Sequence, residues 1–206
     1  MTNRNPRRAG TKIRQEVAAE AARIIATEGQ RSYLAAKHKA AERLRASKGG
    51  LPTNAEIEHA LKEWQHLYGG EEHQQRLMEM RLAAVEAMTF LEPFHPRLVG
   101  PVLEGTADEY SRICLHVFAD DPDAVVIFLM EHGIDFSQER RRIRWHGGQY
   151  REVDVLVVEA GAETVELTLM IGRDAIHAPP SPIDGHPVKR ASIGDLKTLI
   201  DGERKV

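Results

Sequence analysis

Residues 98–118, LVGPVLEGTADEYSRICLHVF, decide the fold class of this chain. Leu98 and Val99 begin an apolar stretch, and Gly100 and Gly105 bound a turn in which backbone can approach a phosphate closely. A polar loop follows, and then apolar residues alternate with Arg112, Cys114 and His116. Because side chains alternate between the faces of a strand, this pattern predicts a second strand with those three residues on one face.

Helical spacing dominates the chain before this segment. Apolar residues recur every three or four positions over residues 11–29, 32–47, 53–69 and 71–90. Thr53 or Asn54 is suited to cap the third helix, and Glu56 falls in its first turn. Residues 1–92 are therefore predicted to form a helical region of about four helices.

Strand patterns dominate the chain after it. Asp121 or Asp123 begins a short helix that ends at Gly133, and three strands are expected over residues 140–146, 150–160 and 163–171. The last two strands are expected to form a hairpin, and Ser192 to cap a final helix. Residues 93–206 are thus predicted to form a mixed-sheet α/β domain, and the whole chain to be an α+β protein.

The charge is distributed unevenly along the 206 residues. The total is −3, but residues 1–50 contain 12 Lys and Arg against 4 Asp and Glu, or +8, and the remainder carries −11. Such asymmetry indicates contact with an anionic partner such as nucleic acid. The alternative is a solvated helix surface with a basic tail. The candidate nucleic-acid contacts are Arg7, Arg8, Lys12, Lys37, Lys39 and Arg43.

Several classes of protein are excluded by composition. No apolar run approaches the roughly 18 residues that a membrane span needs, and no apolar segment follows the basic N-terminus as in a signal peptide. Cys114 is the single cysteine, which excludes an internal disulfide framework, and the ten histidines show no metal-ligand spacing. We therefore expect a cytoplasmic protein without a membrane segment or a bound metal.

The opening segment resembles the signature of the nucleotidyltransferase superfamily in its minimal, antitoxin-like form. That signature is Gly-Ser, a second Gly five residues after the first, and then Ser-Asp-Ile-Asp-Leu. Gly100 and Gly105 match the two glycines, with Thr106 next in the chain, and Ser111 matches the Ser of the second part. The resemblance covers about residues 85–170 and implies a mixed-sheet domain with a nucleotide cleft beside these glycines.

The departures from the signature fall on the chemistry-bearing positions. Pro101 replaces the Ser that would touch phosphate, Arg112 the first metal-binding Asp, and Cys114 the second. Glu166, or less favourably Asp154, would stand for the third carboxylate of the family. A single carboxylate does not assemble a two-metal site, so the resemblance implies a scaffold without catalytic residues or cofactor.

A second arginine group lies in residues 140–144. If these residues form a strand, Arg140, Arg142 and Arg144 share one face, opposite Arg141. Arg142 and Arg144 would then either line the cleft together with Arg112 or pair with carboxylates of the sheet.

These observations predict a non-catalytic, regulatory protein that binds an anionic ligand, nucleic acid or a protein partner. One alternative is an active nucleotidyltransferase that uses Mg²⁺ and a nucleoside triphosphate through relocated carboxylates such as Asp108, Glu109 or Glu166. The other is an antitoxin-like module that masks another protein. The oligomeric state stays open.

Overall fold

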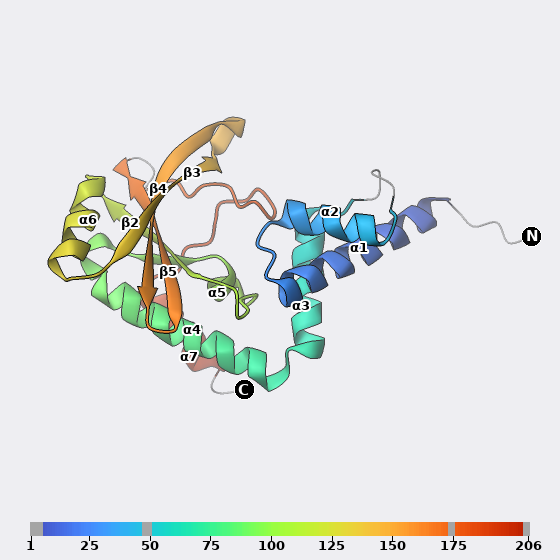
Figure 1. Ribbon diagram of the computed structural model, residues 1–206, viewed down its shortest axis with the longest axis horizontal. Coiled ribbons are helices and arrows are strands. Elements are labelled where there is room, and N and C mark those ends of the chain that lie inside the picture. Colours follow the sequence, from blue (N-terminus) through green and yellow to red (C-terminus); the bar gives the residue numbers. More distant parts are fainter. Residues whose placement is uncertain (1–5, 47–50, 173–175, 204–206) are drawn as a thin grey trace, which may run out of the picture. The chain divides into compact units, whose positions relative to one another are not determined.

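The computed structural model describes residues 6–46, 51–172 and 176–203, with the side chains of residues 6–9 left aside. Contacts divide the chain into two compact units: a helical unit of residues 1–74 with 182–184, and a sheet unit of residues 75–181 with 185–206 (Figure 1). The sequence-based division after residue 92 stays a prediction. In the structure, the boundary between the two units falls between residues 74 and 75, inside the helix Gly70–Phe90, because the later turns of that helix pack on the sheet.

The helical unit consists of the expected helices. They are α1 (Pro6–Glu28), α2 (Tyr33–Arg43), α3 (Asn54–Tyr68) and the first turn of α4 (Gly70–Phe90). Val17, Ile24, Ala36, Ala40 and Ile57 are buried at the centre of this unit. The cap of α3 is Thr53, whose hydroxyl accepts from the Glu56 N–H while the Glu56 carboxylate accepts from the Thr53 N–H, a reciprocal capping box.

The sheet unit combines a mixed sheet with helices. In chain order after α4 its elements are a 3₁₀ turn (Glu92–Phe94), β1 (Arg97–Val99), α5 (Pro101–Glu104), β2 (Ile113–Ala119), α6 (Pro122–Glu131), β3 (Phe136–Arg144), a 3₁₀ turn (His146–Gly148), β4 (Tyr150–Ala160), β5 (Glu163–Ile171) and α7 (Ile193–Glu203). The strand order is β1-β2-β5-β4-β3; β2 and β5 are parallel, and the other neighbours are antiparallel. The α+β class and the β4–β5 hairpin are confirmed.

Helices cover one face of this sheet. Leu98, Ile113, Leu115 and Leu167 of that face are buried in one apolar core with Met88 of α4, and α6 and α7 contribute to the same core. Figure 1 shows α4 running along this side of the sheet. The predicted caps of α6 and α7 are present, because the Asp121 carboxylate accepts from the Asp123 N–H and the Ser192 hydroxyl from the Asp195 N–H.

The opposite face carries polar and charged residues beside a small buried cluster of Val153, Val155 and Val157, and we call it the arginine face. Its members include Arg97 of β1, Cys114 and His116 of β2, Glu166 of β5 and Arg141 of β3, as the strand registers require. The alternation predicted for β2 is therefore present, with Ile113, Leu115 and Val117 turned into the core.

In the part of the chain that the structure describes, no helix combines the length and the apolar character needed to cross a lipid bilayer.

Candidate functional site

The first feature of the site is the backbone at Gly100, between β1 and α5. Gly100 has φ 73° and ψ −155°, a conformation that side chains with a Cβ rarely adopt. A Cβ placed there would lie 3.7 Å from Cys114 Cβ, because β1 and β2 pair Val99 with Cys114. Gly105, with φ 80°, ends the four-residue helix α5. The expected glycine turn is therefore a short helix between two glycines of positive φ.

We expect Gly100→Ala to destabilise the protein by about 1–3 kcal/mol, because alanine is strained at this φ and ψ while the space beside Cys114 accepts a methyl group. Urea denaturation measures the change. Gly202→Ala is the matched control, because Gly202 lies in α7 with open space around it. Alanine at this helical position is expected to increase the free energy of unfolding by about 0.5–1 kcal/mol. Equal effects of the two substitutions would contradict the strain argument.

The polar loop before β2 is held together by its own hydrogen bonds. The Ser111 hydroxyl donates to the Asp108 carboxylate at 2.8 Å, and the same carboxylate accepts from the Tyr110 N–H at 3.0 Å. Thr106 is buried, and its N–H donates to the Pro101 carbonyl. Ser111, Thr106 and Asp108 therefore shape this loop, and Asp108 is already engaged as a hydrogen-bond acceptor.

Glu166 lies where the resemblance would place the third carboxylate. The β2–β5 register pairs it with Cys114, and its side chain is 11% exposed. Arg112 approaches one carboxylate oxygen at 3.2 Å, and Arg141 donates to the other. Arg141 also donates to Glu139 at 2.7 Å. The hydrogen bond to Glu166 contributes most to raising the pKa of Arg141 above its ordinary value, and the hydrogen bond to Glu139 adds to the increase. The carboxylate at this position is thus neutralised by two guanidinium groups.

The structure separates Arg142 and Arg144 from Arg112. Register pairs Arg141 with Val153 on the arginine face, so Arg140, Arg142 and Arg144 occupy the other face of β3. There Arg140 pairs with Asp154 at 3.3 Å, and the Arg142 guanidinium lies 4.4 Å from the centre of the Tyr150 ring. Arg141 is therefore the β3 residue that binds Glu166 together with Arg112. Alternation alone distinguished these two sets, but only the register between β3, β4 and β5 decides which set reaches Glu166.

A second basic group on the arginine face was not anticipated. The Arg190 Nε donates to His116 Nδ1 at 3.1 Å, and its guanidinium lies 5.0 Å from the centre of the Phe118 ring. His116 is buried, and burial together with the charge of Arg190 lowers its pKa to about 3, so the ring is neutral at physiological pH. Burial and the charge of Arg97 lower the pKa of Arg190. Positive charges are thus packed close to one another beside β2.

The basic residues of the helical unit form ion pairs within it. Lys39 and Arg43 each donate to Glu28 at 2.7 Å. These two hydrogen bonds, of which that from Arg43 contributes more, lower the pKa of Glu28 to about 2. Lys37 donates to the Asn54 side chain, and Lys12 lies 3.9 Å from Glu16. The side chains of Arg7 and Arg8 lie outside the described residues. The excess positive charge of this region is therefore partly balanced inside it, and nucleic-acid contact stays a prediction.

No group of three or more His, Cys, Asp or Glu side chains within residues 6–46, 51–172 and 176–203 is arranged to hold a metal ion. Near Gly100, Cys114 contacts the Arg112 carbonyl through its sulfur at 3.6 Å, and Glu166 is bound by arginine.

Comparisons of the chain with family models, with curated proteins and with solved structures find no match.

Proposed function

We propose that this chain is a non-catalytic binding protein on a nucleotidyltransferase-like scaffold, and that its ligand carries phosphate groups that bind the arginine face. The observation that supports the proposal is the pairing of Glu166 with both Arg112 and Arg141. In the family that the sequence resembles, carboxylates at the positions of Arg112, Cys114 and Glu166 hold metal ions. Here one carboxylate faces two guanidinium groups, which favours an anion over a divalent cation.

The wider charge distribution supports an anionic ligand. Four guanidinium groups lie on this face, those of Arg97, Arg112, Arg141 and Arg190. The carboxylates that bind Arg112 and Arg141 are Glu139 and Glu166. The Arg112 and Arg141 side chains are 25% and 35% exposed, so both are partly accessible from solvent. A phosphate group matches the planar guanidinium through paired hydrogen bonds.

Glu166 then acts as an internal competitor for the arginines. A phosphate and this carboxylate present similar oxygens to the same N–H groups, so the ligand would replace part of an existing ion pair. This reasoning distinguishes the proposal from the catalytic alternative, in which Glu166 is a required metal ligand. The two functions predict opposite effects of removing its charge.

We expect ATP in EDTA to bind without Mg²⁺, with an affinity that decreases as salt is raised. Arg112→Gln and Arg141→Gln should each weaken binding by about tenfold, whereas Glu166→Gln should strengthen it by about the same factor. Isothermal titration calorimetry measures these changes. Arg142→Gln is the matched control, because Arg142 lies on the other face of the same strand and should leave affinity unchanged.

Three results would overturn the proposal. Absence of ATP binding to the wild-type protein would leave a protein partner as the remaining function of this face. Equal losses in Arg112→Gln and Arg142→Gln would show nonspecific charge attraction. Nucleotide transfer in Mg²⁺ that Glu166→Gln abolishes would establish the catalytic alternative. Circular dichroism of each variant separates loss of binding from loss of folding.

A further inference from the structure

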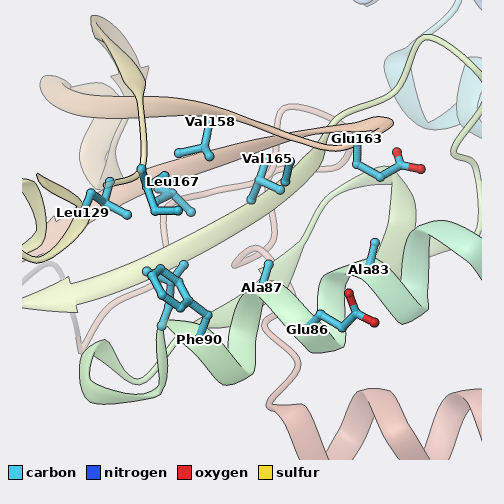
Figure 2. Close-up of a pocket in the computed structure, with 12 residues that line it drawn as sticks. Ala83, Glu86, Ala87, Phe90, Leu129, Val158, Glu163, Val165 and Leu167 are labelled. Carbon is cyan, nitrogen blue, oxygen red and sulfur yellow. The ribbon is translucent and has the colours of Figure 1, made fainter. Parts of the chain in front are cut away.

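A pocket of about 280 Å³ lies on the helix-covered side of the sheet unit, opposite the arginine face. Ala83, Ala87 and Phe90 of α4 form one wall, and Val158, Val165 and Leu167 of the sheet form the other. Figure 2 shows these side chains turned toward the space between the helix and the strands. The pocket is a feature of this unit alone.

Small residues on α4 create this space. Ala83, Ala87 and Phe90 are spaced by four and three positions, so they follow one helix face, and the two alanines stand opposite valines of β4 and β5. Protein interiors are usually packed without voids of this size, and leucine at either alanine would fill part of the space. An apolar concave surface with few polar groups is the usual form of a small-molecule site.

The polar groups of the pocket are carboxylates at one end. In Figure 2 the carboxylates of Glu86 and Glu163 extend on the side where Ala83 lies, and Phe90 and Leu129 occupy the opposite end. Arg76 binds both oxygens of Glu163, one of them at 2.8 Å, so the charge of that residue is balanced. Glu86 is exposed and forms no ion pair with any residue that the structure describes.

We propose that this pocket binds a small organic cation with an apolar body, of which an alkylammonium ion is the simplest form. The hydrocarbon part occupies the space between Ala87 and Val165, and the ammonium group lies at the end where Glu86 supplies one unbalanced negative charge. An apolar anion would meet that carboxylate as a like charge, and a neutral alcohol would gain no ion pair from it. The site is separate from the proposed phosphate site, because the two lie on opposite faces of the sheet.

The test compares octylammonium, octanol and octanoate, each below its aggregation concentration, by calorimetry and by methyl NMR of the full-length protein. Octylammonium should bind most tightly and shift the methyl signals of Val158, Val165 and Ala87. Glu86→Gln should weaken octylammonium binding by about tenfold and leave octanol binding unchanged. Glu71→Gln, on the same helix but not among the residues that line the pocket, is the matched control and should have no effect.

Ala87→Leu should abolish binding of all three compounds by occupying the pocket, and Ala83→Val provides a second obstruction if the first variant does not fold. Binding of octanol as tight as that of octylammonium would overturn the proposal. The proposal would also be overturned if octylammonium failed to bind the wild-type protein. It would equally be overturned if neither Glu86→Gln nor the obstructing substitutions changed the affinity for octylammonium.

Discussion

Acidification from pH 7 to pH 4 is expected to remove about 3 kcal/mol of stability through His116 alone. The pKa of His116 is lowered from 6.5 to about 3 in the folded protein, by burial first and by the charge of Arg190 second. The unfolded chain therefore binds a proton at this residue at a higher pH than the folded chain does. Between pH 6.5 and pH 3 the free energy of unfolding falls by about 1.4 kcal/mol for each unit that the pH decreases, and above pH 6.5 this contribution is constant.

Urea denaturation across this pH range, with and without His116→Gln, measures the effect. The glutamine carbonyl can still accept from Arg190 Nε but does not titrate, so the stability difference between wild type and variant should shrink as the pH falls. His59→Gln is the control, because the His59 side chain is 77% exposed and its variant should follow the wild-type curve. Parallel curves for wild type and His116→Gln would show that His116 accepts a proton without penalty.

The largest loss from a single truncation is expected at Arg81. This guanidinium is 2% exposed on α4; its Nε donates to the Val102 carbonyl of α5 at 3.1 Å, and its Nη1 bonds Glu203 of α7. Arg81→Ala leaves the Val102 carbonyl without this donor and opens a cavity between three helices. We expect it to reduce the free energy of unfolding by about 3–5 kcal/mol, measured by urea denaturation.

Arg140→Ala is the control for that measurement. Arg140 also forms an ion pair, with Asp154, but its side chain is 67% exposed, so its removal should cost less than about 1 kcal/mol. A similar loss in both variants would show that burial of Arg81 does not determine its contribution. Through its hydrogen bond to the Val102 carbonyl, Arg81 also holds the segment from Gly100 to Gly105 against α4.

Local signals in the sequence predicted most of the helices and strands. Thr53, Asp121 and Ser192 cap helices where the sequence indicated, since a cap depends on residues within one turn of it. The alternation around Cys114 predicted β2, because strand periodicity is also a local property. Two elements differed from the expectation. A four-residue helix replaced the expected turn between Gly100 and Gly105, and the strand expected over residues 140–146 begins at Phe136 and ends at Arg144.

The candidate site depended on pairings that no local pattern contains. Sequence periodicity separated Arg141 from Arg142 and Arg144, but it left open whether Arg142 and Arg144 lie beside Arg112, because the face of β3 that reaches Glu166 is set by register across β4 and β5. Arg190 lies 74 residues from His116 in the chain, so no spacing rule connects them. The apolar pocket likewise arises only when Ala83 and Ala87 meet Val158 and Val165.

The sequence by itself determined the helical N-terminal region, the mixed α+β class and the position of Arg112, Cys114 and His116 on one face of the second strand, because these follow from residue identity and short-range spacing. The tertiary structure decided which charges meet: Glu166 with Arg112 and Arg141, His116 with Arg190, and Lys39 and Arg43 with Glu28. The physical reason is that electrostatic and packing partners are chosen by distance in the folded chain, and strand register and helix packing set that distance.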